Sequence, residues 1–387
     1  MEPLLLSEGS RHRPELLDLA VELASKSSGF RRSLPPGIYA ALAKLVRTMN
    51  CYYSNLIEDH NTHPVDIERS MENDYSQDTQ KRDLQFEAKA HVICQEWVDG
   101  GGLKGRVYTV EGLLEIHRRF CELLPDDLLW VENHATKERV RIIPGEMRKR
   151  DVKVGQHFAV SPGALPRFMK RFEEVYCQLG KSESILAAAG AHHRFAWIHP
   201  FIDGNGRVAR LMSHASMLET LDTGSVWSVS RGLARSVKDY KDFLQKADME
   251  RRNDLDGRGS LSEEALAEFT RYFLQTCLDQ VNFMEGLVQP ERLRTRIMLW
   301  AEEEIRMKTL PEKAGAVLDA MLYRGELPRG EVSGIIGVVS RHASRITSAL
   351  IKEGVLSSES QRAPFRLSFP AKLAPRWMPN LFPEKMD

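Results

Sequence analysis

Residues 199 to 210, HPFIDGNGRVAR, bring together several groups that could act on phosphates. The Gly-Asn-Gly run at 204–206 is followed at once by a helical pattern, so it should lie at a helix N-terminus. Free backbone N–H groups and the positive end of the helix dipole bind anions there. Arg207 and Arg210 are three residues apart and share one face of the first turn, which suits bidentate phosphate contacts. The segment therefore predicts a nucleotide phosphate site.

Two further groups give this segment a role in catalysis. Asp203 precedes the glycines, and a single carboxylate beside phosphates is a usual way to hold Mg²⁺. His199 has the side chain that titrates near neutral pH, so it could take a proton from an attacking hydroxyl. Neither Cys nor Ser lies within 199–210, so we expect the nucleophile to belong to the substrate. A lone histidine or an isolated GxG would be weak signals, but so many charges at one helix start favour a bound ligand.

The segment resembles the signature of the Fic family, His-Pro-Phe-x-Asp/Glu-Gly-Asn-Gly-Arg-x-x-Arg, without a departure. The resemblance covers about residues 106–290 well. It implies a protein adenylyltransferase that moves AMP from ATP to a hydroxyl side chain of a target protein, itself included, and releases pyrophosphate. Transfer of another nucleotide, such as UTP or GTP, stays open because the sequence does not define the base pocket.

The resemblance also implies a role for each residue of the motif. His199 would be the base, Asp203 the magnesium ligand, Gly204, Asn205 and Gly206 the anion cradle, Arg207 the contact to the β-phosphate, Arg210 the contact to the γ-phosphate, and Phe201 the anchor of the loop.

A second motif lies ahead of this region, in YYSNLIEDHN. Ser54 and Glu58 are four residues apart, which alone is an ordinary helical pair. Beside a Fic signature it resembles the inhibitory motif Ser/Thr-x-x-x-Glu-Gly/Asn of one class of the family, with Asp59 where Gly or Asn is usual. The resemblance implies that Glu58 pairs with Arg210 and blocks the γ-phosphate. In some relatives this glutamate orients a water that removes AMP, so hydrolysis is an alternative.

Two weaker features flank the motif. The run RVRIIPGEMRKRDVKVG predicts a two-stranded hairpin around Pro144-Gly145, and it resembles the family's flap, which adds the target as a strand. Arg148, Val152 and Val154 are candidates for that edge, with an ordinary edge hairpin as the alternative. Tyr240 lies on a later helix, where family members often line the adenine pocket; a core position is its alternative.

The elements that must position these residues are mainly helical. A helix opened by SLPPG should run to Glu58, Thr109 should cap a later helix, and the helix before the motif should end at His199-Pro200. We expect the fold class to be mainly α: a Fic-fold helical bundle with a β-hairpin flap. Three regions follow, a helical N-terminal region with the inhibitory helix (1–105), a Fic catalytic core (106–290) and a winged helix-turn-helix (310–375).

The C-terminal region carries the other candidate function. A short helix, a turn at Gly337, a second helix and a strand pair predict the winged helix-turn-helix. The window 329–372 holds seven Lys and Arg against three Glu, a local charge of +4. Arg341 and Arg345 should project from the second helix, so a DNA-binding regulator is the alternative class. A module for protein contacts explains the same charge.

Composition limits the remaining classes. The 387 residues include 54 Lys and Arg against 54 Asp and Glu, so no global charge draws the chain to nucleic acid or to an acidic membrane. The five cysteines form no CxxC pair, which argues against a structural zinc or a disulfide framework. No run is long enough to span a bilayer, and we expect a cytoplasmic protein. A homodimer that holds Glu58 in place is compatible with the sequence.

Overall fold

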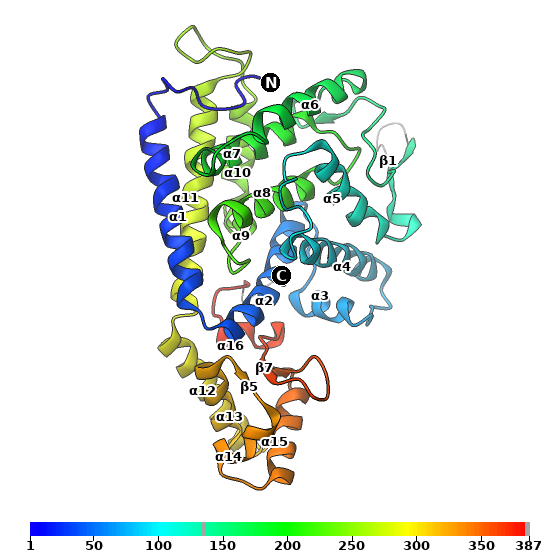
Figure 1. Ribbon diagram of the computed structural model, residues 1–387. Helices are drawn as coiled ribbons and strands as arrows, with labels where there is room; N and C mark the ends of the chain where they lie inside the picture. The colour runs from blue at the N-terminus through cyan, green and yellow to red at the C-terminus, as the bar shows by residue number, and fades with distance from the viewer. Residues whose placement is uncertain (133–136, 384–387) are drawn as a thin grey trace. The chain divides into compact units, whose positions relative to one another are not determined.

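The computed structural model describes residues 1–132 and 137–383, and this part is mainly helical, which confirms the expected fold class (Figure 1). The α-helices are α1 (Arg13–Ser33), α2 (Pro36–Ile57), α3 (Pro64–Met71), α4 (Thr79–Asp99), α5 (Val110–Glu122), α6 (Leu165–Tyr176), α7 (Lys181–Ile198), α8 (Asn205–Leu221), α9 (Val229–Arg235), α10 (Val237–Ala247), α11 (Glu263–Leu287), α12 (Pro290–Arg306), α13 (Ala314–Arg324), α14 (Val332–Ile336), α15 (Ser340–Lys352) and α16 (Ala374–Trp377). The strands are β1 (Trp130–Glu132), β2 (Arg139–Arg141), β3 (Lys153–Val154), β4 (His157–Phe158), β5 (Glu326–Leu327), β6 (Leu356–Ser357) and β7 (Phe365–Leu367).

The chain divides into two compact units. One consists of Met1–Ser28 and Asn50–Val281, and the other of Gly29–Met49 and Asn282–Asp387. The whole segment 199–210 belongs to the first unit.

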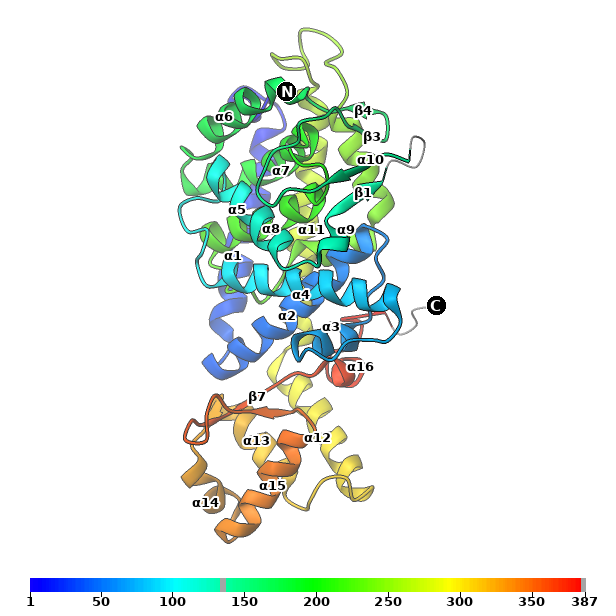
Figure 2. The same ribbon diagram turned by 90° about the vertical axis from the view of Figure 1, so that its right-hand side faces the viewer.

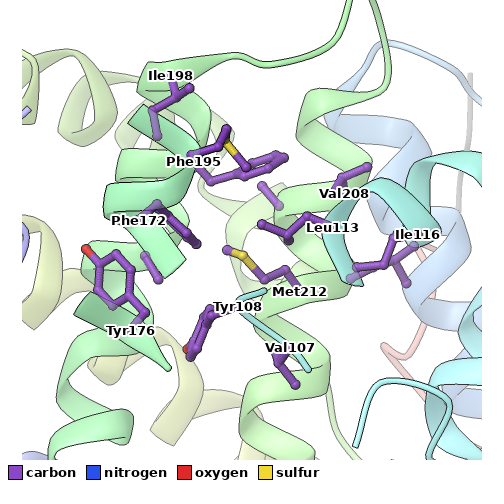
Figure 3. Close-up of a cluster of buried hydrophobic side chains, with 14 of the residues drawn as sticks. Val107, Tyr108, Leu113, Ile116, Phe172, Tyr176, Phe195, Ile198, Val208 and Met212 are labelled. Atoms are coloured by element: carbon purple, nitrogen blue, oxygen red, sulfur yellow. The ribbon is translucent and has the colours of Figure 1, made fainter. Parts of the chain in front are cut away.

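Helices α7 and α8 form the centre of the first unit. Nearly every side chain in the second half of α7 is buried, which is the pattern of a helix enclosed by others, and α8 packs directly against it. Figure 3 shows Phe195 of α7, Val208 and Met212 of α8, and Leu113 and Ile116 of α5 around one apolar cluster. This core fixes the end of α7 and the start of α8, and the segment 199–210 joins the two.

The predicted helix boundaries are found in the structure. The Thr109 hydroxyl accepts a hydrogen bond from the Gly112 N–H at 2.9 Å and caps α5. Helix α2 ends at Ile57, and α7 ends at Ile198 because the next residue precedes a proline. In Figure 2, α8 and α5 lie close to α4 in the same unit, and both pairs are in contact.

The predicted hairpin around Pro144-Gly145 is wrong in its position. Strand β1 pairs antiparallel with β2, and β3 with β4, so one strand pair precedes this turn and another follows it. Gly145 adopts φ 73°, and its N–H donates to Nδ1 of His117 at 2.9 Å. The runs on the two sides of the turn each pair with another strand on their own side, and a buried histidine binds the backbone of the turn.

The second unit contains the elements predicted for the C-terminal region. Helix α14 ends at Gly337, whose φ of 61° is left-handed, and α15 follows. Strand β7 pairs antiparallel with β6 on one side and with β5 on the other. The assignment of this region as a winged helix-turn-helix stays a prediction.

Two general features complete the description. Within residues 1–132 and 137–383, no helix has the length and apolar character needed to cross a membrane. Cys51, Cys94, Cys121 and Cys277 are buried free thiols, and Cys177 is an exposed one.

Candidate active site

His199 lies at the end of α7 in a left-handed backbone conformation, with φ 52° and ψ 62°. Its N–H still donates to the Phe195 carbonyl at 3.0 Å, whereas Pro200 prevents the helix from continuing. A left-handed residue with a side chain costs about 1–2 kcal/mol, so such a turn persists only where its surroundings fix it. The position of the imidazole is therefore set by contacts around the turn.

Arg148 supplies these contacts. It is 3% exposed, and its guanidinium donates to the carbonyl of His199 at 2.8 Å, to that of Arg150 at 2.7 Å and to that of Val160. Its backbone N–H donates to the Pro200 carbonyl at 2.8 Å. We predicted Arg148 at the edge that binds a target, but its side chain lies beneath the His199 turn because its donors are used by buried carbonyls. Arg148 is therefore a positioning residue.

The His199 side chain is in the neutral form that a proton acceptor requires. Burial lowers its pKa to about 4, a direction to which Arg148 adds, while the Ala196 carbonyl and Asp203 act in the opposite direction. The ring is therefore neutral at pH 7. Its Nδ1 lies 3.3 Å from the Ala196 carbonyl, and an N–H there leaves the lone pair on Nε2 free.

The loop after His199 is closed by its own residues. The Phe201 N–H donates to Oδ1 of Asn205 at 2.9 Å, and Nδ2 of Asn205 donates to the Phe201 carbonyl at 2.9 Å. Phe201 is fully buried, in agreement with its predicted role as an anchor. Gly204 has φ 81°, which favours glycine. The Asn205 side chain therefore shapes the loop, and its backbone begins α8.

His117 of α5 supports the same loop and was not predicted. Its ring stacks on Phe201, with centroids 3.9 Å apart and planes 3° apart. Burial lowers the pKa of His117 to about 4, so the neutral ring accepts the Gly145 N–H at Nδ1. His117 thus ties the 144–145 turn to the loop. The only signal in the sequence was its position on the buried face of α5.

A carboxylate occupies the anion position at the start of α8. A Cβ atom added to Gly206 would lie 2.2 Å from Oε1 of Glu58, so glycine is needed for this close approach. Arg210 donates from Nη2 to the same Oε1 at 2.5 Å. Since helix N-termini bind anions, Glu58 lies where a phosphate would be expected to bind.

The last turn of α2 surrounds Arg210, which is 1% exposed. Its Nε donates to the Ser54 hydroxyl at 2.8 Å, and its Nη2 to the Ser54 carbonyl at 3.1 Å. Burial alone would raise the pKa of Glu58, but the charge and hydrogen bond of Arg210 outweigh it and lower the pKa. The contact implied by the inhibitory motif is therefore present, with Glu58 ionised.

The backbone conformation after Glu58 explains why the inhibitory motif usually has Gly or Asn at the position of Asp59. The Asp59 N–H donates to the Leu56 carbonyl at 3.1 Å, and the His60 N–H to the Asn55 carbonyl at 2.9 Å. This pattern is a Schellman motif, in which the residue after the cap is left-handed. Asp59 occupies that position with φ 61°, and Asp tolerates this conformation less well than Gly.

Arg207 is held by a different carboxylate. Its Nη2 donates to Oε2 of Glu87, in α4, at 3.0 Å, and its guanidinium lies 5.0 Å from the centre of the Phe120 ring. Burial disfavours the charge, but Glu87 outweighs this effect and raises the pKa of Arg207. Glu87 was not predicted, because it lies 120 residues away from Arg207 in the sequence.

Asp203 is the residue predicted to bind Mg²⁺. Its side chain is exposed at the start of the site, and within the described chain no hydrogen bond or ion pair engages its carboxylate. The same described residues contain no group of three or more His, Cys, Asp or Glu placed to hold a metal. Mg²⁺ commonly binds through one or two carboxylates with substrate phosphates and water, so this arrangement fits the ion.

The other predicted residues lie around this centre. Tyr240 is buried, its hydroxyl lies 2.7 Å from Nε2 of His192, and Arg210 is close enough to affect its pKa, which burial raises to about 12. Its role in an adenine pocket stays a prediction. Val154 of β3 is 43% exposed, and the Val152 carbonyl accepts the Ala159 N–H at 3.2 Å. Their role in target binding is likewise a prediction.

The fold and the site together define the class of protein. Residues 107–217 match the family model described as "Fic/DOC family", a range that includes His199, the glycine loop and both arginines. This part of the chain is therefore similar to a Fic domain.

Comparisons with individual proteins agree with this class. The protein adenylyltransferase Fic of Drosophila erecta is 30% identical over 128 residues, which are 33% of this chain and 23% of that protein. The protein of the same name from Drosophila sechellia is 35% identical over 112 residues, or 28% of this chain and 20% of that protein. The chain thus aligns with less than a quarter of each relative.

Solved structures show the fold over more of the chain. A Fic family protein from Desulfovibrio desulfuricans superposes with a TM-score of 0.55 at 16% identity, covering 94% of this chain and 98% of that one. Fic-1 from C. elegans gives a TM-score of 0.50 at 18% identity, covering 71% and 72%. These similarities establish the fold.

Proposed function

We propose that the protein is an adenylyltransferase that transfers AMP from ATP to a hydroxyl side chain of a target protein. The observation that carries the proposal is the Glu58 carboxylate against Gly206 and on Arg210, because it marks an anion site at the start of α8. The neutral His199 at the end of α7 supplies a base for the same site. The name of the Drosophila relatives supports AMP as the group transferred.

The proposed reaction uses these positions. The oxygen of the target hydroxyl attacks the α-phosphorus of ATP, and its proton passes to Nε2 of His199. The bond between the α-phosphorus and the oxygen that bridges to the β-phosphate breaks, and pyrophosphate leaves. Arg207 and Arg210 would stabilise the negative charge on the leaving group. His199 later returns the proton to solvent.

Asp203 would hold Mg²⁺ beside the phosphates. The ion would neutralise part of their charge when bound. The Asp203 carboxylate contributes by fixing one ligand position at the start of α8, on the exposed side of the loop.

Glu58 would restrain the reaction in the structure as it stands. The γ-phosphate needs the fork of Arg210, and the Glu58 carboxylate already accepts a hydrogen bond from Nη2 of that fork. Two anions on one guanidinium repel each other, so ATP would bind weakly or in a pose that His199 does not serve. Withdrawal of the α2 end would remove the restraint.

Two variants of the activity use the same residues. Glu58 could instead orient a water that removes AMP from a modified target, and the transferred nucleotide could carry another base. Intact-protein mass spectrometry of Glu58→Gly, incubated with Mg²⁺ and ATP, UTP or GTP in turn, separates these cases. We expect a mass increase of one AMP with ATP alone. Absence of any adduct, with release of AMP from a modified protein by the wild type, would assign removal instead.

The second unit offers a candidate function of another class, DNA binding. Arg341 and Arg345 of α15 are exposed, and within the described residues neither makes an ion pair, whereas Arg324 and Arg366 of the same unit do. Exposed cations on one helix face can bind the phosphate backbone of DNA. Binding to duplex DNA that weakens with salt and with Arg345→Gln would support this function, and salt-independent or absent binding would exclude it.

A further inference from the structure

We propose that His60 and Glu87 form a second contact that holds the Glu58 turn against α8, so that the restraint on the active site depends on both. The proposal rests on the proposed function, because it concerns regulation of the same site. Neither residue belongs to the motif at 199–210 or to the inhibitory motif.

The contact joins three elements at one carboxylate oxygen. Nδ1 of His60 lies 2.7 Å from Oε2 of Glu87, and Nη2 of Arg207 donates to this same oxygen at 3.0 Å. His60 directly follows the turn at the end of α2, Glu87 belongs to α4, and Arg207 to the first turn of α8. Side-chain exposure falls from 36% for His60 to 15% for Glu87 and 6% for Arg207, so the contact extends inward from the surface.

The charges of the group indicate which atoms donate. Burial alone would raise the pKa of Glu87, but His60 and Arg207 outweigh it and lower the pKa, so Glu87 is a carboxylate. The hydrogen bond to Glu87 raises the pKa of His60. The imidazole therefore donates from Nδ1, and its approach to Nη2 of Arg207 at 3.2 Å brings together two donors that share one acceptor.

The geometry couples the two arginines of α8 through one short segment. Glu58 holds Arg210, and two residues later His60 holds the carboxylate that is bound to Arg207. Glu58 cannot withdraw with its turn unless the bond between His60 and Glu87 lengthens or breaks. A phosphate that engages Arg207 would compete with Glu87 for the same Nη2, which would loosen His60 and hence Glu58. Arrival of the nucleotide and release of the restraint would then be linked.

The test measures AMP transfer by His60→Ala in two backgrounds, with His63→Ala as the matched control from the same loop. His63 is exposed and lies outside the contact. With Glu58 intact, we expect His60→Ala to raise the rate on the order of tenfold, the value of one charge-assisted hydrogen bond. In Glu58→Gly we expect no change, because the restraint is already absent. A fall in both backgrounds, or no rise with Glu58 intact, would overturn the proposal.

A second readout does not require activity. Hydrogen exchange of the backbone N–H groups of residues 58 to 60, which donate to Asn55 and Leu56, reports opening of the turn directly. We expect faster exchange in His60→Ala and in Glu87→Gln, but not in Glu72→Gln, whose residue is exposed at the end of α3. Unchanged exchange in both would contradict the proposal. If Glu58→Gly transfers no AMP at all, the proposed function fails, while this measurement still decides the contact.

Discussion

Helices α8 and α15 both begin with two arginines about one turn apart, but the surroundings of these arginines differ. At the start of α8, Arg207 and Arg210 are almost completely buried, and each donates to a carboxylate from another helix or its end. On α15, Arg341 and Arg345 are exposed, with no ion pair in the part of the chain that the structure describes.

The difference indicates what each helix can bind. A buried guanidinium needs a partner, since leaving it uncompensated costs about 3–5 kcal/mol. Under the proposed function, an anion that takes Nη2 of Arg207 or Arg210 would compete with Glu87 or Glu58, which would link its binding to release of the restraint. The cations of α15 are exposed, so a partner could pair with them without displacing a carboxylate of the described residues.

The largest effect is expected from a third buried arginine. Arg148→Met removes the donors to the carbonyls of His199 and Val160, so buried carbonyls lose their partners. We expect a loss of about 2–4 kcal/mol in the free energy of unfolding. AMP transfer by the Glu58→Gly form should fall on the order of a hundredfold because the base is misplaced. Denaturant unfolding measures the free energy of unfolding, and mass spectrometry measures AMP transfer. Equal effects of Arg150→Met, at an exposed site, would refute this role.

Glu58→Gln tests the pairing of Arg210 directly. The substitution keeps the shape and removes the charge, so the free energy of unfolding should fall by about 1–2 kcal/mol, a modest value because the Glu58 side chain is 35% exposed. Transfer should rise on the order of tenfold or more, since the γ-phosphate meets no competing carboxylate. If stability falls but AMP transfer is unchanged, the ion pair between Glu58 and Arg210 does not restrain the reaction.

The pH dependence tests the contact between His60 and Glu87, which also binds Arg207. The hydrogen bond to Glu87 raises the pKa of His60; Arg207 opposes this shift, and Glu58 adds to it. The contact between His60 and Glu87 is then complete below pH about 6.5, the ordinary pKa of histidine. It is lost as the pH rises through the raised pKa of His60 in the folded protein. The ratio of the transfer rate of the wild type to that of Glu58→Gly should therefore increase severalfold with pH. A ratio independent of pH would contradict the pairing.

Asp59→Gly should strengthen the restraint. Gly adopts the left-handed conformation at this position without the cost to a side chain, so we expect about 1 kcal/mol more stability and lower AMP transfer than in the wild type. Thermal unfolding and the transfer assay give the result. Asp59→Ala should lower the stability and raise AMP transfer. Shifts in the same direction in Asp59→Gly and Asp59→Ala would count against the Schellman turn.

The smallest effect is expected on α15. Arg341→Gln and Arg345→Gln should change the free energy of unfolding by less than about 0.5 kcal/mol, because both side chains are solvated. Larger losses would mean that these arginines have structural partners, and the contrast between the helices would then disappear.

Local signals in the sequence predicted most of the helices and the centre of the site. The Thr109 cap, the proline after His199 and the glycines before α8 each act on their own neighbours, so their effects can be inferred without a structure. Pairing of Glu58 with Arg210 could be inferred only through a family resemblance, since 152 residues separate them.

The remaining parts depend on contacts that no local pattern specifies. Arg148 was predicted at a target-binding edge because its run resembles the family's flap, whereas its donors point to backbone carbonyls, which carry no sequence signature. The strand pairs were misplaced because His117, far away in the sequence, binds the turn at Gly145. The contact between His60 and Glu87 was not predicted because it also joins residues that are far apart in the sequence.

In the proposed function, the start of α8 binds the phosphates of ATP for attack assisted by His199, and Glu58 opposes this. The most direct measurement is incubation of the wild type, Glu58→Gly and Glu58→Gly with His199→Ala, each with Mg²⁺ and ATP labelled at the α-phosphorus. We predict strong protein labelling in Glu58→Gly, weak labelling in the wild type and none in the double variant. Equal labelling in all three, or none in any, would contradict the account.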